Sequence, residues 1–507
     1  MAVAERAPVE QGDIAKRGFV TLSVMLATIM QALDTTIANV ALPHMRGAMG
    51  ATQDQISWVL TSYIVAAAIA MPLTGFVAAR IGRKRLFSYS VIGFTVASML
   101  CGAAQSLEQI VLFRLLQGIF GASLVPLSQS VLLDTYPREQ HGSAMAMWGV
   151  GVMVGPILGP SLGGWLTEYY NWRWVFYINI PFGILAWMGI SAFVKETELD
   201  PKRRFDLFGF ALLSLAIGSL QMFLDRGESQ NWFESMEIVL EAALAGLTMY
   251  LFIAHMFTAR KPFLEPQMFR DRNFSVGVLF GFMLGVILLA TMALLPPFLQ
   301  GLMNYPVIDV GILLTPRGFG TMAGMMIVGR IANKVDLRYV IAIGLLLMIV
   351  SLWEMTLFSV DVTKWDIIRT GIVQGLGLGL TFVPLSTLTF STLPASFRNE
   401  GTALFSLIRN IGSSIGISIV TTYLSHRMQI NHAVFSEYIT PFNTGLQQAM
   451  QHGMYNIHSD IGLVSVNTEV TRQAAILGYL QDFRFMMFVV LAMFPLLGLL
   501  SKPQRRA

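Results

Sequence analysis

Residues 149–164 read GVGVMVGPILGPSLGG, and the rest of the chain is best understood from this stretch. Glycine recurs every four residues, which places the glycines in one stripe along a helix, and two prolines lie within the same helix. These residues are Gly151, Gly155, Gly159, Gly163, Pro156 and Pro160. In water each interior Gly costs about 1 kcal/mol and each Pro about 3 kcal/mol relative to Ala. In lipid the backbone must bond internally, so the stretch predicts a membrane-spanning helix.

The stripe has two interpretations. A bare glycine face lets a second backbone approach closely, as in static small-xxx-small helix contacts. The prolines remove backbone bonds and permit bending, which suggests instead a pivot between two moving helix bundles. The remainder of the sequence favours the pivot, because it predicts a transporter.

The composition predicts an all-α polytopic membrane protein. Of 507 residues, 54% are hydrophobic and only 13% are charged, unlike an ordinary soluble protein. The one cysteine, Cys101, excludes a disulfide framework and a thiol metal site. We expect no metal and no cofactor. Residues 1–18 lack a cleavage signal, so we expect the first span to act as an uncleaved insertion signal.

Apolar runs long enough to cross about 30 Å of hydrocarbon occur fourteen times. They lie near 19–42, 55–79, 86–105, 108–132, 143–166, 175–194, 206–224, 237–258, 274–301, 309–333, 338–359, 367–393, 401–426 and 483–501.

The positive-inside rule gives the orientation. With a cytoplasmic N-terminus, the inner segments hold 23 of the 34 Lys and Arg residues and the outer segments hold eight. This asymmetry predicts that both termini are cytoplasmic.

An internal repeat divides the chain. Gln117-Gly118 returns at Gln374-Gly375, and the VPLS of 125–128 returns at 383–386, at offsets of 257 and 258. Chance similarity of apolar segments is the alternative, but further matches occur in the same order. They are Pro137 with Pro394, and Gly75 and Arg80 with Gly329 and Lys334. Parallel repeats are typical of transporters whose halves rock about a central site.

We therefore expect two pseudo-symmetric six-helix halves around an inserted helix pair, a 6+2+6 arrangement. The predicted segments are a tail over 1–18, a bundle over 19–200, the pair over 205–258, a bundle over 270–501, and a tail over 502–507. Within the second bundle we expect a long periplasmic loop over 428–480, suited to docking a partner. Its histidines, His432, His452 and His458, lack metal-ligand spacing and fit a solvated loop.

Ionisable residues inside spans are costly and so mark functional candidates. Asp34 lies eight residues before the outer end of the first span, and Arg114 lies six residues into the fourth. At 1.5 Å per residue both are roughly 9–12 Å below the outer surface, so we expect an ion pair. A permanent structural pair is one interpretation. The other, which we favour, is proton coupling, because a buried carboxylate that loses its cationic neighbour takes up a proton.

Further polar residues within the spans are candidates for lining a central substrate cavity. They are Gln31, Asn39, Gln117, Arg317, Glu354, Arg409 and Asn410. Glu354 and Glu241 could instead reach the membrane surface, and Asp225 is expected in an interfacial turn.

The chain resembles the major facilitator superfamily, in particular its fourteen-span drug:proton antiporter branch with the EmrB-type multidrug exporters. LDTTIANVALP (33–43) is similar to the branch's first-helix motif, whose acid falls on Asp34. LFRLLQGIFGA (112–122) resembles its fourth-helix motif, whose arginine falls on Arg114. The opening stretch matches the antiporter motif of its fifth helix, and WRWVFYINIPFG (172–183) and LDRGESQNWF (224–233) are also similar.

The stretch GFVAARIGRKR (75–85) resembles the superfamily's loop between the second and third helices. The residues that match this loop motif are Gly75, Arg80, Gly82, Arg83 and Lys84. Ala79 replaces the family's usual acid, which leaves a charge latch between the halves without its expected carboxylate.

The resemblance implies a proton-coupled multidrug efflux antiporter that exports hydrophobic or amphipathic compounds by alternating access. It implies the major facilitator fold, a place in the bacterial inner membrane, an EmrA-like periplasmic adaptor and a TolC-type outer-membrane channel. Lipophilic drugs, protons and membrane lipid are the expected partners, and nucleic acid is not.

Other function classes fit less well. The phosphate-loop pattern G-x-x-x-x-G-K-[ST] is absent from the sequence, which disfavours an ATP-driven pump. A membrane-embedded enzyme would need clustered His, Cys or paired carboxylates near one depth, whereas the seven histidines are scattered or in loops, so we expect no enzyme. Proton-coupled uptake of a small solute is the alternative function, and only the family resemblance of the glycine-proline helix argues against it.

Overall fold

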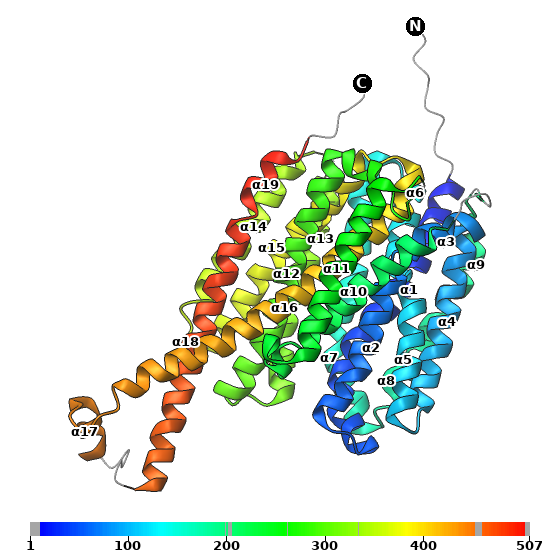
Figure 1. Cartoon of the computed structure of the whole chain (residues 1–507). Helices are drawn as coiled ribbons and strands as arrows, with labels where there is room; N and C mark the ends of the chain where they lie inside the picture. The colour runs from blue at the N-terminus through cyan, green and yellow to red at the C-terminus, as the bar shows by residue number, and fades with distance from the viewer. Residues whose placement is uncertain are drawn as a thin grey trace.

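The computed structural model is a bundle of long helices (Figure 1). It describes residues 11–197, 199–200, 205–260, 262–332, 334–451 and 459–501. Over these residues all regular structure is helical. Thirteen helices are long and apolar enough to cross a membrane, or fourteen when the bent pair of α2 and α3 is counted as one span. The predicted all-α membrane fold with fourteen spans is confirmed.

The first half of the chain forms one bundle. Its helices are α1 (Gln11–Met49), α2 (Gln53–Ala70), α3 (Leu73–Ile81), α4 (Arg83–Ala103), α5 (Leu107–Gly121), α6 (Leu124–Thr135), α7 (His141–Tyr169), α8 (Trp174–Tyr177) and α9 (Asn179–Phe193). The α2–α3 bend of 57° lies where Pro72 interrupts the backbone bonding of a single apolar run.

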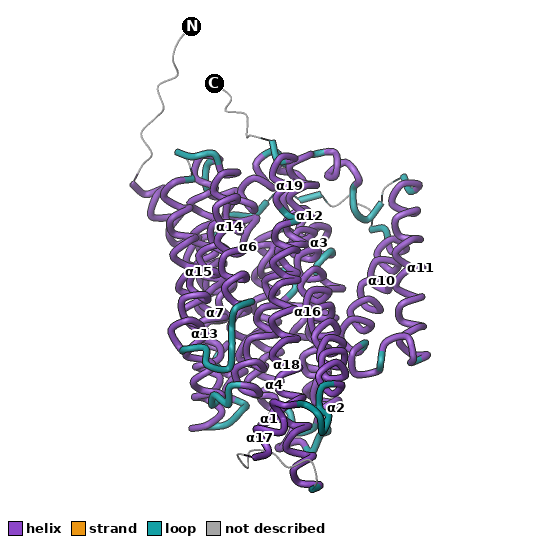
Figure 2. Tube along the Cα trace, turned by 90° about the vertical axis from the view of Figure 1, so that its left-hand side faces the viewer, coloured by secondary structure: helices purple, strands orange, loops and turns teal. Residues whose placement is uncertain are grey.

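Two helices stand between the bundles in sequence and to one side of them in space. They are α10 (Leu207–Arg226) and α11 (Met236–Thr258). They pack on each other, and α10 contacts both α2 and α16 (Figure 2). Asp225 accepts a hydrogen bond from Thr61 of α2, and Glu241 pairs with Arg226 at 3.4 Å.

The second half forms the other bundle. Its helices are α12 (Arg272–Pro297), α13 (Val307–Ile331), α14 (Leu337–Met355), α15 (Lys364–Ser391), α16 (Arg398–Glu437), α17 (Thr444–Gln451), α18 (Asp460–Leu491) and α19 (Phe494–Leu499). A π-helical turn, η5 (Phe298–Leu302), follows the two prolines that end α12. Such turns occur where the regular bonding ladder is interrupted.

The predicted loop over 428–480 is mostly helical, so this expectation was wrong. α16 runs on to Glu437 and α18 begins at Asp460, so the two form a hairpin that projects from the bundle (Figure 1). Asn431 donates to the carbonyl of Ala474, and His432 bonds to Asn467 at 3.0 Å. A polar helix gives no hydropathy signal, so the sequence pattern resembled a loop. His452 and His458 lie outside the described residues.

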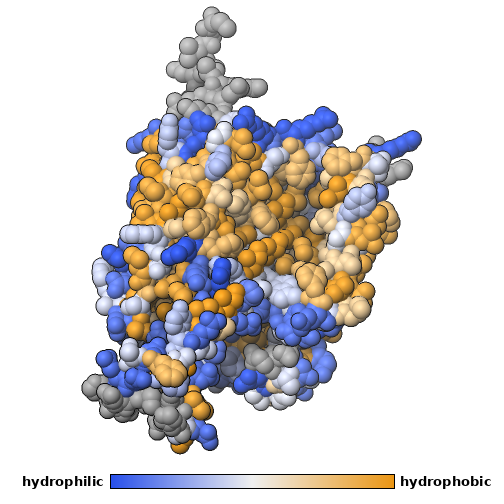
Figure 3. All heavy atoms as spheres, turned by 60° about the vertical axis from the view of Figure 1, so that its left-hand side comes forward, coloured by the Kyte–Doolittle hydropathy of each residue, from blue (hydrophilic) through white to orange (hydrophobic). Residues whose placement is uncertain are grey.

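The described chain starts and finishes at the same end of the bundle. Ser501 donates its backbone N–H to Asn273 at the start of α12, and Thr21 near the start of α1 bonds to Tyr136 beyond α6. We call this the terminal end, and we call the opposite end, from which α16 and α18 project, the hairpin end. An apolar belt crosses the face shown in Figure 3, with polar residues above and below it. This is the pattern expected of a multi-pass membrane protein.

Candidate functional site

Asp34 and Arg114 meet in the interior of the first bundle. Arg114 Nη1 lies 2.7 Å from Asp34 Oδ2, and each side chain is only 1% exposed. α1 and α5 therefore bring together the two charges that matched in depth in the sequence. The expected ion pair is present, and its role in proton coupling stays a prediction.

Two amides, a backbone carbonyl and an aromatic ring complete the cluster. Gln117 and Asn179 each donate to Asp34 Oδ1 at 2.8 Å. Arg114 donates through Nε to the Val59 carbonyl at 3.0 Å and through Nη1 to Gln117 at 2.8 Å, and its guanidinium lies 4.3 Å from the centre of the Tyr63 ring. A charged carboxylate with these donors is well stabilised despite its burial.

Sequence reasoning missed Asn179 and Tyr63. Asn179 begins α9 and also donates to Ser98 at 2.9 Å, so it ties Asp34 to α4. It is the one amide side chain in the apolar segment 174–193. A single amide in an otherwise apolar span could have identified it as a candidate site residue. Tyr63 has no comparable signal, because tyrosine is ordinary in membrane helices.

The predicted cavity residues fall into separate groups. Gln117 is part of the Asp34 cluster, and Gln31 reaches it by donating to the Tyr63 hydroxyl at 3.3 Å. Asn39 is exposed and bonds within its own helix to Thr35. Glu354 lies away from the cluster, at the hairpin end of α14, where it pairs with Arg369 at 3.4 Å.

The remaining candidates belong to the second bundle. Arg317 on α13 is buried and donates to the Leu288 carbonyl at 3.3 Å. The Arg409 guanidinium lies 5.6 Å from the centre of the Phe382 ring, and that ring stacks on Trp148 of the first bundle. Arg409 is therefore directed toward the boundary between the halves, and its neighbour Asn410 is exposed.

The glycine stripe of α7 faces α1 of its own bundle. A Cβ on Gly155 would meet the Ala32 backbone, and one on Gly159 would meet Thr36. Thr36 also donates to the Gly155 carbonyl at 3.1 Å. Gly151 and Gly163 likewise face Met25 and Val40, and Pro156 and Pro160 lie within the unbroken helix. The stripe is thus a close contact inside one half.

The boundary between the halves uses a different face of α7. Gly142 meets Ala332, Gly149 meets Met325, and Ile157 meets Gly318, all on α13 or directly after it. The expectation that the stripe itself forms the pivot was therefore wrong. Glycine spacing identifies a close-packed face, but the sequence does not tell which neighbour occupies it.

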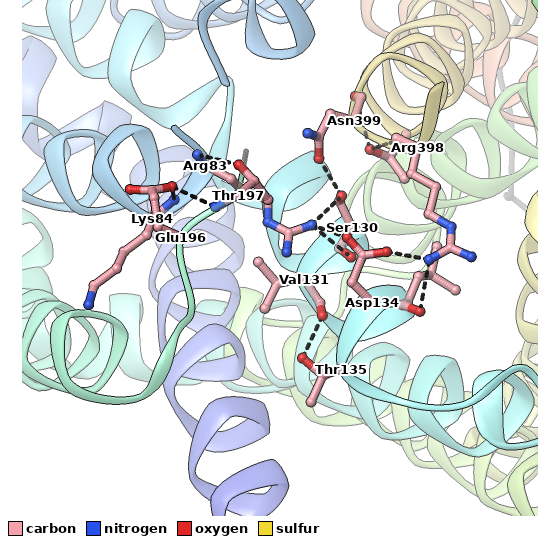
Figure 4. A network of polar contacts seen from close by, with 12 residues as sticks. Arg83, Lys84, Ser130, Val131, Asp134, Thr135, Glu196, Thr197, Arg398 and Asn399 are labelled. Carbon is pink, nitrogen blue, oxygen red and sulfur yellow. Dashed lines mark hydrogen bonds and ion pairs between the residues drawn. The ribbon is translucent and has the colours of Figure 1, made fainter. Parts of the chain in front are cut away.

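A charged contact joins the halves at the terminal end, contrary to the inference drawn from Ala79. Asp134, at the end of α6, forms ion pairs with both Arg83 of the first bundle and Arg398 of the second (Figure 4). Ser130 also bonds to Asn399 across the boundary. We call Arg83, Ser130, Asp134, Arg398 and Asn399 the latch. The acid comes from α6 instead of the loop.

The loop motif itself shapes this end. Gly75 lies against Glu400, where a Cβ would clash. Gly82 has φ +98°, a conformation that favours glycine, and Glu196 occupies the space beside it. Glu196 accepts the backbone N–H of Lys84 at 3.0 Å, whereas Arg80 is exposed.

Among the residues that the structure describes, no group of three or more His, Cys, Asp or Glu side chains is arranged to hold a metal ion. Cys101 is buried and donates to Gln117 at 3.5 Å.

Comparison with known proteins places the chain among membrane transporters. The family model of the Major Facilitator Superfamily matches residues 24–417. Multidrug export protein EmrB of Haemophilus influenzae is 36% identical over 93% of this chain and 92% of that protein. Fatty acid resistance protein FarB of Neisseria gonorrhoeae is 35% identical over 96% and 97%.

Solved structures show the same fold at low sequence identity. The proton:xylose symporter XylE aligns with a TM-score of 0.59 at 13% identity, covering 94% of this chain and 96% of that one. A bacterial homologue of the human lysosomal transporter Spinster, in an inward-facing conformation, aligns with a TM-score of 0.56 at 18% identity over 97% and 98%.

Proposed function

The chain belongs to the major facilitator superfamily, in the fourteen-span branch that contains the EmrB-type exporters, and we propose that it is a proton-coupled exporter of hydrophobic and amphipathic compounds. It is a membrane transporter, not an enzyme. The observation that carries the proposal is the Asp34 cluster: a fully buried acid held by an arginine and two amides within one moving half. The name of the multidrug export protein EmrB supports the direction of transport, and the names of EmrB and of the fatty acid resistance protein FarB support the class of substrate.

Proton binding would act through the bonds that Asp34 makes. In the observed arrangement both carboxylate oxygens accept hydrogen bonds, Oδ2 from Arg114 and Oδ1 from Gln117. A proton arriving from outside neutralises Asp34 and removes its attraction to Arg114. The contacts between α1, α5 and α9 then weaken together, and because α1 packs on the α7 stripe, the change reaches the helix that borders the other half.

The substrate would lie between the halves. The Phe382 and Trp148 rings meet there, and the Arg409 guanidinium lies over one of them. Aromatic faces suit lipophilic molecules of varied shape, and a cation beside them favours those that also carry a negative group. Release of the latch between Asp134 and Arg398 would open the terminal end to load the substrate from the cytoplasm.

The proton gradient supplies enough energy for this exchange. A proton that moves down about 100 mV releases about 2.3 kcal/mol. At about 1.4 kcal/mol per tenfold ratio, one proton sustains a substrate gradient of roughly 40-fold. No cofactor and no ATP are needed.

We further propose that the protein lies in a bacterial inner membrane with its terminal end and both termini in the cytoplasm. The excess of Lys and Arg in the segments of that end supports this orientation. The hairpin of α16 and α18 would then project into the periplasm, where it offers a surface to an EmrA-like adaptor. A TolC-type channel would complete the path across the outer membrane.

Substrate-induced proton release tests the proposal. Purified protein in weakly buffered detergent is mixed with ethidium, and the released protons are followed with a pH-sensitive dye. Wild type and the control Asp460→Asn, an exposed acid on α18, should release protons. Asp34→Asn should lose the proton release that ethidium induces, at unchanged expression. Proton release at the wild-type level in Asp34→Asn would overturn the proton role.

Accumulation of ethidium in cells tests the direction. Cells that express the wild type should hold less dye than cells without it, and Asp34→Asn should remove the difference. Higher accumulation with the wild type would instead indicate uptake.

A further inference from the structure

A second acid is buried in the other half of the protein. Asp482 on α18 is 0% exposed, and neither carboxylate oxygen has a hydrogen-bond partner among the described residues. It forms none of the ion pairs found in that part of the chain. The predicted last span begins at residue 483, so Asp482 falls in the polar segment before it.

The surroundings of Asp482 are aromatic. Tyr479 lies three residues before it, one turn along the same helix, and Phe483 follows it. The Phe298 ring of η5 is 5.2 Å from the Tyr479 ring and 6.3 Å from the Phe483 ring. Phe358, just beyond α14, stacks on Phe298 at 6.2 Å. The acid therefore lies beside an apolar cluster near the hairpin end.

The charged and titratable groups on the neighbouring elements have other partners or lie elsewhere. α12 carries only Arg272 at its terminal end, and η5 carries none. On α14, Arg338 bonds to Asp336 and Glu354 pairs with Arg369, and Tyr339 is at the terminal end. On α16, Arg398 belongs to the latch and Glu400 lies against Gly75. The guanidinium groups of Arg409 and Arg427 lie over the rings of Phe382 and Tyr423. His432 bonds to Asn467, and His426 and Glu437 are exposed. On α18 itself, Asp460 and Arg484 are exposed, and the half-buried Arg472 pairs with Glu469.

An ionised carboxylate without partners is the costliest group to bury, because nothing replaces the water it loses. The neutral acid avoids most of that cost. Asp34 differs, because a cation and two amides support its charge. One conformation of the protein thus holds one acid suited to be charged and another suited to carry a proton.

We propose that Asp482 is a second proton-binding site, in the half of the transporter that lacks the Asp34 cluster. The site lies close to the hairpin end, from which a proton would enter under the proposed orientation. η5 lies beside it and follows Pro296 and Pro297, which lack the backbone N–H groups of a regular helix. The role in transport rests on the proposed function, whereas the binding of the proton does not.

Infrared difference spectroscopy tests the binding of the proton directly. At neutral pH, wild type in detergent should show the carbonyl-stretch band of a protonated carboxyl group. The band should be absent from Asp482→Asn and retained in the control Asp460→Asn. Persistence of the band in Asp482→Asn would overturn the site. Asp482→Glu provides an independent variant: it keeps an acid, so the band should move in frequency without vanishing, and an unmoved band would also refute the assignment.

Counting protons tests the role in transport. In proteoliposomes, the number of protons exchanged per ethidium exported should fall by one in Asp482→Asn and stay unchanged in Asp460→Asn. An unchanged count in Asp482→Asn would show that the proton on Asp482 does not cycle. Asp34→Asn separates the two proposals: if it retains full antiport the proposed function fails, while the infrared result still decides the Asp482 site.

Discussion

The two bundles share a packing plan and differ in their charges. In the first, Gly155 and Gly159 of α7 lie against the α1 residues Ala32 and Thr36. In the second, Gly412 and Gly416 of α16 lie against the backbone of α12. The pairs are separated by 257 positions, the same offset that relates Gln117 to Gln374. The repeat has therefore kept the close helix contacts on which each bundle depends.

The buried polar residues of the two bundles, unlike the helix contacts, are not repeated between the halves. Gln117 donates to the carboxylate of Asp34, whereas its counterpart Gln374 donates to the hydroxyl of Thr291 at 3.3 Å. The position that corresponds to Arg114 is Gly371, and the Arg317 side chain begins beside it, its Cβ 3.6 Å from the position a Cβ on that glycine would take. The two halves therefore share the packing of their helices, while their buried polar groups differ in kind and place.

The largest difference between the halves should appear when each buried arginine is removed. Arg114→Gln leaves the Asp34 carboxylate buried without its cation, which should cost about 3–5 kcal/mol of stability. Arg317→Gln removes a hydrogen bond to a carbonyl and should cost about 1 kcal/mol. Thermal unfolding in detergent, followed by tryptophan fluorescence, measures both. Adding Asp34→Asn to Arg114→Gln should recover part of the loss, and equal losses in the two single variants would refute the contrast.

The shared packing predicts equal sensitivity at the two stripes. Gly155→Ala and Gly412→Ala each place a methyl group against the backbone of a neighbouring helix, at an expected cost of about 1–3 kcal/mol. Gly164→Ala is the matched control on α7, because nothing lies within 4 Å of its added Cβ. The same unfolding assay should show it unchanged or slightly more stable. Destabilisation by only one of Gly155→Ala and Gly412→Ala would contradict a shared packing of the two bundles.

The smallest effect concerns the boundary where the halves meet. The Asp134 side chain is 30% exposed, so solvent weakens its ion pairs. Arg398→Gln should shift the equilibrium between the closed and the open terminal end toward the open form by about 1 kcal/mol, or about fivefold. Arg83→Gln, which breaks a contact inside the first bundle, should shift it less. Disulfide formation between Gly142→Cys and Ala332→Cys, which adjoin across the boundary, reports the closed fraction. Faster crosslinking in Arg398→Gln would contradict the latch.

Much of this architecture could be predicted because the membrane constrains it. Hydrocarbon thickness fixes the length of apolar runs, which gave the spans, and the cost of a buried charge singled out Asp34 and Arg114. Depth along each span then predicted that the two would meet.

Other features depend on how the helices are rotated and paired, which no pattern in a single span records. The sequence shows the glycine stripe of α7, but it does not show that α1 is the helix packed against it. Asp134 follows an apolar run and looked like an ordinary end residue, although it bridges both halves. Asp482 was missed because it precedes the most apolar part of the last span, while its burial comes from α18 packing on α12, α14 and α16.

α16 is a long helix that connects the latch to the hairpin. Arg398 and Asn399 in its first turn bond to the other bundle, and its far end forms one arm of the hairpin. A continuous helix of 40 residues measures about 60 Å. If α16 stays straight, a tilt of only about 10° at its first turn would therefore move its hairpin end by roughly 10 Å. A neighbouring protein bound to the hairpin would therefore respond to whether the terminal end is open or closed, without contacting the substrate.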